Sequence, residues 1–191
     1  MGKDKQSLRD FQAHLAERLA SAKQAWTASK LGLLVGGQPW LTELSAVSEV
    51  VSEAQIVPVP WAKPWFLGLT NVRGVIYGCT DLAGFMGMDV AGEWGDSRLL
   101  IVHPRHGLNA ALRIEGTLGL FNIAQMTRQV RPADAPPWIE AVWRGADERI
   151  WTELNIGGLV TSARFLDAGI DRVAMRLIMS RSTNHTHTLE R

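Results

Sequence analysis

The spacing of hydrophobic residues changes character near residue 31. In the preceding segment, apolar side chains recur every three or four positions with charged residues between them, namely Leu8, Phe11, Leu15, Leu19, Ala22 and Trp26. This period is typical of an amphipathic helix, which we expect over residues 4–29. A single helix needs a surface to pack on, and the pattern leaves open whether that surface is its own domain or a partner.

From residue 31 onward, short apolar runs alternate with glycine, proline and asparagine, as expected for many short strands joined by turns. The predicted strands are residues 31–36, 39–44, 66–72, 75–80, 98–103, 108–115, 119–121, 138–143, 149–151 and a last one within 170–179. We expect short helical segments at residues 46–51, 81–87 and 156–168. The pattern predicts an all-β sandwich or barrel.

Two proline-rich segments divide this β region. Pro58, Pro60 and Pro64 lack the backbone N–H that a sheet interior requires, so the chain up to residue 64 is not an inner strand. The run RPADAPP at residues 131–137 is stiff and is predicted to mark a boundary between two halves of the β region.

The predicted turn at residues 71–74 has an arginine at its tip. Asn71 suits the first position of a tight turn, and Gly74 accepts the positive φ that closes a hairpin with a bulge. Arg73 places a permanent planar cation at this corner, where packing alone does not require one. A guanidinium held on a rigid turn suits recognition of a carboxylate or a backbone carbonyl.

The composition of the chain is that of a globular protein, and it disfavours nucleic-acid-binding, membrane-spanning and secreted proteins. The chain has 191 residues, 46% hydrophobic and 20% charged, and a net charge of +1, which is ordinary for a globular domain and does not favour a dedicated nucleic-acid binder. No apolar run approaches the length of a membrane span, and the charged N-terminal segment lacks the apolar centre of a signal peptide. With one cysteine and no such segments, we expect a cytoplasmic protein without membrane insertion.

Residues capable of catalysis or metal binding are scattered. His103 and His106 share a loop without a third ligand nearby, so no metal site is predicted there. Cys79 lies within an apolar strand, where a thiol is expected to be buried and protonated. Asp81 is expected to cap the helical turn that follows it. No phosphate-binding glycine motif is present, so we predict neither a catalytic residue nor a cofactor.

Taken in order, residues 56–82 (IVPVPWAKPWFLGLTNVRGVIYGCTDL) resemble the signature of CheW-like coupling proteins of bacterial chemosensory arrays. The similarity extends over roughly residues 31–170, from LLVGGQPWLTELSAVSEV through the strand beginning at Arg98 to the segment beginning at Trp138. Gly78 and Cys79 depart from the family pattern, which has a proline and an aliphatic residue there. The N-terminal extension and many tryptophans resemble the family's members in type IV pilus twitching systems.

The resemblance implies two five-stranded SH3-like barrels around a shared core, with an N-terminal helix and a short C-terminal helix. Residues 1–30 would form the helical extension, residues 31–179 the CheW-like domain and residues 180–191 a flexible tail. It also implies a non-enzymatic adaptor between a methyl-accepting receptor and the regulatory domain of a CheA-type histidine kinase. The carried-over docking residues are Asn71, Val72, Arg73 and Gly74.

A different hypothesis is a small β-barrel that binds a ligand or a nucleic acid. Exposed tryptophans on such a barrel can stack on bases. Phosphate recognition also needs cations grouped around the aromatic rings, and the sequence places few near Trp61, Trp65, Trp94, Trp138 and Trp143. This distribution favours the adaptor.

Overall fold

The computed structural model describes residues 29–52, 54–88 and 97–169. The predicted helix over residues 4–29 falls outside these residues except at its last position, Ser29, which begins a strand. The predicted strand within residues 170–179 and the tail also lie outside them.

The described residues form strands joined by short helical turns. The strands are β1 (Ser29–Val35), β2 (Gln38–Glu43), β3 (Val47–Val51), β4 (Ile56–Val57), β5 (Phe66–Val72), β6 (Val75–Asp81), β7 (Arg98–Val102), β8 (Ala110–Ile114), β9 (Gly116–Asn122), β10 (Thr127–Gln129), β11 (Ile139–Arg144) and β12 (Ile150–Leu154). The helices are η1 (Leu44–Ala46), α2 (Leu82–Met86), η3 (Pro104–His106), η4 (Ile123–Gln125), α3 (Ile156–Val160) and α4 (Ala163–Leu166). The predicted all-β class is confirmed.

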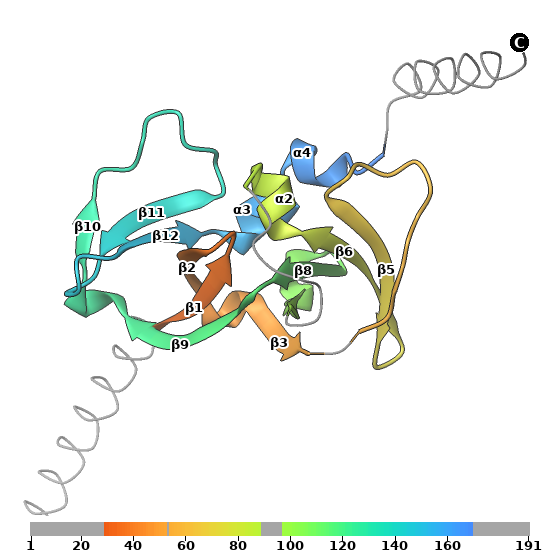
Figure 1. Ribbon diagram of the computed structural model, residues 1–191, viewed down its shortest axis with the longest axis horizontal. Helices are drawn as coiled ribbons and strands as arrows, with labels where there is room; N and C mark the ends of the chain where they lie inside the picture. Colours follow the sequence, from red (N-terminus) through yellow and green to blue (C-terminus); the bar gives the residue numbers. More distant parts are fainter. Residues whose placement is uncertain (1–28, 53, 89–96, 170–191) are drawn as a thin grey trace, which may run out of the picture.

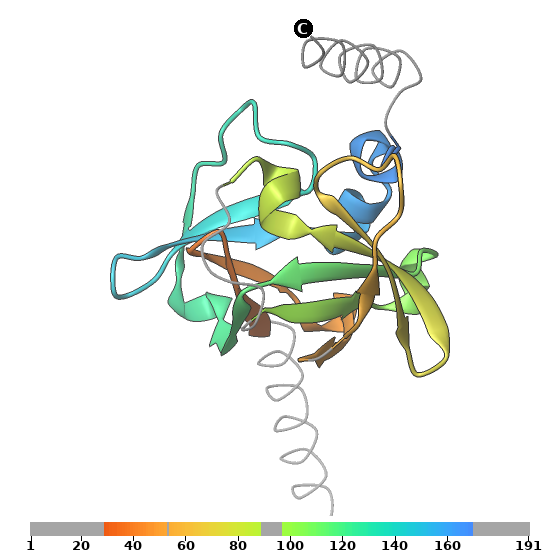
Figure 2. The ribbon, with the colours of Figure 1, turned by 45° about the vertical axis from the view of Figure 1, so that its right-hand side comes forward.

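These strands make two barrel-like units lying side by side (Figure 1). Unit A is a six-stranded sheet in the order β10-β11-β12-β2-β1-β9, and unit B is a six-stranded sheet in the order β3-β7-β8-β6-β5-β4. Two barrel-like units were predicted and are present. Each described sheet, however, has six strands rather than five, and no hydrogen bonds join its first strand to its last. Figure 2 shows both sheets strongly curved.

The register of unit A determines which side chains face its interior. Directly opposed residues share a face, and Lys30 is opposite both Glu43 and Phe121. Leu41 is opposite Glu153, and Trp143 is opposite Trp151. The interior of unit A therefore combines buried apolar residues with a buried lysine and a buried glutamate.

Unit B has a mostly apolar interior, beside the buried pair of Asp81 and Arg113. A cluster of buried side chains fills it, namely Val72, Tyr77, Cys79, Leu99, Ile101 and Ala111. The alternate residues of the same strands, such as Leu100, Val102 and Leu112, face the other way. Both faces of these strands are thus buried, which explains their nearly continuous apolar sequences.

A larger core joins the two units. It contains Leu31, Leu33, Val35 and Trp40 from unit A, Leu100, Val102, Leu112 and Ile114 from unit B, and residues of α2 and α3 between them. The helices α2, α3 and α4 lie together over this junction in Figure 1. Because both units contribute to one apolar core, they form a single packed body.

Several predicted elements differ from the structure. Residues 47–51, predicted as part of a helix, form strand β3, because Val47, Val50 and Val51 pair with β7 and the valines suit a pleated surface. The short strands β4 and β10 were not predicted. The closing helix is divided into α3 and α4, since the hydroxyl of Ser162 accepts a hydrogen bond from Phe165 N and begins a new helical turn.

The predicted boundary at residues 131–137 is wrong. This segment connects β10 to β11, which are antiparallel neighbours within unit A. Arg131 Nη2 donates to the carbonyls of Ala135 and Pro136 at 2.8 and 2.9 Å, which holds the segment as a protruding loop. The chain instead crosses from unit A to unit B between β2 and β3, and returns between β8 and β9.

We expect Gly68→Ala to destabilise the fold by about 2–4 kcal/mol. Gly68 has φ +131°, and a Cβ there would lie 2.1 Å from the carbonyl oxygen of Val57 on the neighbouring strand. Gly116→Ala is the matched control, because a Cβ added at Gly116 would meet no other atom within 4 Å. Equal unfolding free energies of the two variants in urea would contradict this reading of the β4–β5 contact.

Candidate functional site

The corner at residues 71–74 is a two-residue hairpin turn. Val72 pairs with Val75, and the two residues between them, Arg73 and Gly74, have φ +53° and +86°. Positive φ at both positions is the type I′ geometry, so the predicted bulge is not needed to close this hairpin. Asn71 Oδ1 accepts a hydrogen bond from Gly74 N at 2.8 Å and fixes the turn.

The guanidinium of Arg73 is presented to solvent. Its side chain is 80% exposed, and its Nη2 lies 3.0 Å from Glu49 Oε2 on β3. Val72, by contrast, is buried in the interior of unit B, so its side chain supports the corner from beneath. A surface pair of this kind contributes at most about 1 kcal/mol to folding, so its main effect is to orient the cation.

Glu49 was not among the predicted site residues. It lies on β3 at the opposite end of the sheet order from the β5–β6 hairpin, and the curvature of unit B brings the two together. The sequence offers a weak signal, an acidic residue within the valine-rich stretch Val47–Val51. Nothing in that stretch indicates that the partner of Glu49 is Arg73.

An exposed apolar face adjoins this corner. Val57, Leu69 and Ile76 are 61%, 40% and 52% exposed. The pairs Val57–Leu69, Leu69–Gly78 and Asn71–Ile76 place these side chains on one face of β4, β5 and β6. We call Val57, Leu69 and Ile76 the hairpin face. Contiguous exposed apolar side chains are typical of a protein-binding surface.

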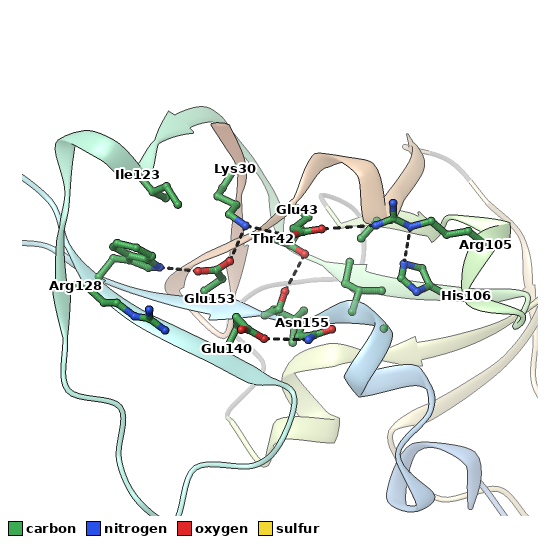
Figure 3. A pocket seen from close by; sticks show the side chains of 15 residues that line it. Lys30, Thr42, Glu43, Arg105, His106, Ile123, Arg128, Glu140, Glu153 and Asn155 are labelled. Atoms are coloured by element: carbon green, nitrogen blue, oxygen red, sulfur yellow. Dashed lines mark hydrogen bonds and ion pairs between the residues drawn. The ribbon is translucent and has the colours of Figure 1, made fainter. Parts of the chain in front are cut away.

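A cavity of about 360 Å³ opens where unit A meets η3 of unit B. Its lining includes Lys30, Glu43, Arg105, Arg128, Glu140, Trp143 and Glu153 (Figure 3). We call it the unit A pocket. It holds charged groups of both signs and is lined by side chains from both units, since Arg105 and His106 come from unit B.

A buried ion pair lies in this pocket. Lys30 Nζ is 2.8 Å from Glu153 Oε1, and the two side chains are only 10% and 6% exposed. Trp143 Nε1 donates to Glu153 Oε2 at 2.7 Å. Glu43 lies 3.4 Å from Lys30 and 3.6 Å from Arg105, which extends the network to the pocket rim.

The environment of Lys30 raises its pKa. Burial alone lowers the pKa, but the hydrogen bond and charge of Glu153, together with Glu43, outweigh burial. The pair therefore stabilises the fold below the ordinary lysine value of 10.5, and this contribution is lost as pH rises through the folded-state pKa.

The remaining candidate groups have structural environments. Cys79 is fully buried, and burial raises the pKa of its thiol to about 11. His103 Nδ1 accepts a hydrogen bond from Arg105 N at the start of η3. The pKa of His106 is lowered by burial and by the nearby charges of Arg105 and His103. Within the described ranges, no three potential metal ligands gather.

The prediction that the Asp81 side chain caps α2 is wrong. Asp81 stands at the N-cap position of α2, but its side chain makes no capping hydrogen bond. Its carboxylate instead lies 3.6 Å from Arg113 Nη1, and both side chains are nearly buried. The buried guanidinium attracts the carboxylate more strongly than the N–H groups of a five-residue helix.

Two of the tryptophans that were expected to have few cations nearby each have one arginine close to the ring. The guanidinium of Arg128 lies 5.8 Å from the ring centroid of Trp143, and that of Arg164 lies 5.9 Å from Trp138. Trp138 is buried beside Phe85, and Trp65 packs against Phe85 and Phe165, so both belong to the core. Trp143 remains at the pocket, and Trp94 lies outside the described residues.

Two barrel-like units share one core, and unit B presents an exposed arginine on a tight turn. The family model of the CheW-like domain matches residues 31–164, so this chain belongs to the CheW-like family, as its sequence predicted. It is 28% identical to Protein PilI of Pseudomonas aeruginosa over 153 residues, which cover 78% of this chain and 83% of PilI.

Among solved structures, the chain resembles the scaffolding protein TtCheW from Thermoanaerobacter tengcongensis, with a TM-score of 0.56. The match covers 67% of this chain and 88% of that protein at 20% identity, and it concerns the fold alone. Separately, no helix in the described part of the chain has the length and apolar character needed to cross a membrane.

We expect Lys30→Met to destabilise the chain by about 3–5 kcal/mol, because Glu153 would be left as a buried charge without its cation. Lys63→Met is the control, since it removes a more exposed pair with Asp167 and should cost at most about 1 kcal/mol. The double variant Lys30→Met/Glu153→Leu should recover most of the loss. Urea unfolding tests this, and equal costs for the two lysine variants would contradict it.

We expect the Cys79 thiol to resist modification in the folded chain. With a pKa of about 11, roughly one thiol in ten thousand is ionised at neutral pH, and the side chain is fully buried. A water-soluble disulfide reagent should therefore label the protein only after denaturant is added. Rapid labelling of the native protein would show that Cys79 is accessible.

Proposed function

We propose that this chain is a non-enzymatic adaptor that couples a methyl-accepting chemoreceptor to the regulatory domain of a CheA-type histidine kinase. The observation that carries the proposal is the Arg73 corner, a cation 80% exposed on a turn that a side-chain hydrogen bond holds rigid. Such a group binds a partner with little loss of conformational entropy, because its backbone is already fixed.

An adaptor needs two separate docking faces on one rigid body. The hairpin face is apolar and adjoins the Arg73 corner, which suits the barrel surface of the kinase's own CheW-like domain. The unit A pocket lies between the units and suits the hairpin helices of the receptor. The core common to both units connects these faces, so binding at one can alter the packing of the other.

The similarity to PilI supports a chemosensory pathway that controls type IV pilus twitching. In that role the protein would work in the cytoplasm, held at membrane-bound receptor arrays by its partners. Modest affinity at each face is sufficient, because many such contacts act together in an array.

Nucleic-acid binding is less well supported than protein docking. A phosphate backbone is bound by cations that are not already neutralised. In the unit A pocket, Lys30 and Arg105 face Glu153 and Glu43, so most of its positive charge is compensated.

We expect Arg73→Ala to leave the unfolding free energy nearly unchanged and to weaken binding to the kinase or receptor fragment about tenfold. Calorimetric titration against each fragment measures the affinities. Arg149→Ala is the control, because Arg149 is also exposed and paired with a carboxylate, that of Asp147. Unchanged binding of Arg73→Ala to both fragments would remove the corner from the docking surface.

A further inference from the structure

Arg128 differs from the other cations of the unit A pocket. It lies on β10 opposite Trp143, is exposed, and places its guanidinium 5.8 Å from the ring centroid. Lys30 and Arg105 have carboxylate partners, whereas Arg128 forms no ion pair with any carboxylate in the described ranges. Its charge is therefore free to meet a partner at the mouth of the pocket.

The indole ring of Trp143, over which Arg128 lies, is fixed by contacts in the interior of unit A. The indole N–H of Trp143 donates to Glu153 at 2.7 Å, and Glu153 is held by Lys30 at 2.8 Å. A hydrogen bond to a buried ion pair fixes the plane of the ring. A guanidinium lying over such a ring retains in-plane N–H donors that match the two oxygens of a carboxylate.

Glu140 makes the β11 side of the pocket negatively charged, opposite in sign to the β10 side. It reaches the pocket from β11, as Arg128 does from β10 (Figure 3), and accepts a hydrogen bond from Asn155 Nδ2 at 3.0 Å. No ion pair joins Glu140 to Arg128 within the part of the chain described. An entering acidic group is attracted on the β10 side and repelled on the β11 side, which determines how it can be placed.

We propose that Arg128, supported by Trp143, receives an acidic side chain from the helical hairpin of the receptor. This rests on the adaptor function proposed above and specifies the partner's chemistry at the unit A pocket. A cavity of about 360 Å³ with compensated charge accepts one side chain of a helix. A phosphate polymer carries a charge at every nucleotide, and beyond Arg128 it would meet the carboxylates of Glu43, Glu140 and Glu153.

The test is calorimetric titration of the unaltered full chain and its variants with a receptor hairpin fragment. We expect Arg128→Gln to weaken binding tenfold or more, because a charge-assisted bidentate contact is lost. Arg128→Lys should recover only part of the affinity, since an ammonium lacks the planar fork. Glu140→Gln should strengthen binding severalfold by removing a repulsive charge.

Arg149→Gln is the matched control, with the same change of charge on the β11–β12 turn. Equal affinities of the unaltered chain and Arg128→Gln, or equal losses for Arg128→Gln and Arg149→Gln, would overturn the inference. Weaker binding by Glu140→Gln would overturn it too, because the pocket would then hold a basic group.

Failure of this inference can be told apart from failure of the proposed function. If Arg73→Ala still weakens binding in these cases, the proposed function stands. If the unaltered chain binds no receptor fragment, both proposals fail.

Discussion

The structure depends on one apolar core to which both curved sheets contribute. Leu31 and Leu33 from unit A meet Leu100 and Leu112 from unit B, and α2 and α3 fill the space between the sheets. Neither described sheet closes on itself by hydrogen bonds, so each unit relies on this contact to bury one of its faces. Burying a leucine contributes about 1.5–3 kcal/mol, which makes separation of the units costly. The two proposed docking faces are therefore held at a fixed distance from each other.

Each unit buries an ion pair beside apolar side chains. In unit B, Asp81 lies opposite Arg113 on the strand faces that carry Tyr77, Cys79 and Ala111. In unit A, Lys30 is buried against Glu153, and this pair fixes geometry because each charge requires its partner. Trp143 is positioned by that pair, and it supports the exposed guanidinium of Arg128. A buried electrostatic contact thus orients a group at the surface.

Local patterns in the sequence predicted much of this fold. Alternating apolar runs located most of the strands, and the proline-rich approach correctly excluded an inner strand before Phe66. The hairpin tip was found from Asn71, Arg73 and Gly74, since turn geometry depends on neighbouring residues. Predictions failed where tertiary contacts outweigh local preference. Val47–Val51 became a strand through pairing with β7, and the Asp81 carboxylate turned to Arg113 instead of capping a helix.

The sequence by itself determined the fold class, the family and the presence of a cation on a rigid corner, because these follow from residue types at short spacing. Only the tertiary structure decided that Glu49 faces Arg73 and that Lys30 and Glu153 share one buried site. Those partners lie far apart in the chain, and strand order and register bring them together. The walls of the unit A pocket come from β1, β2, β10, β11, β12, η1, η3, η4 and α3. No short segment of the sequence contains more than a part of this pocket, so it has no local sequence signature.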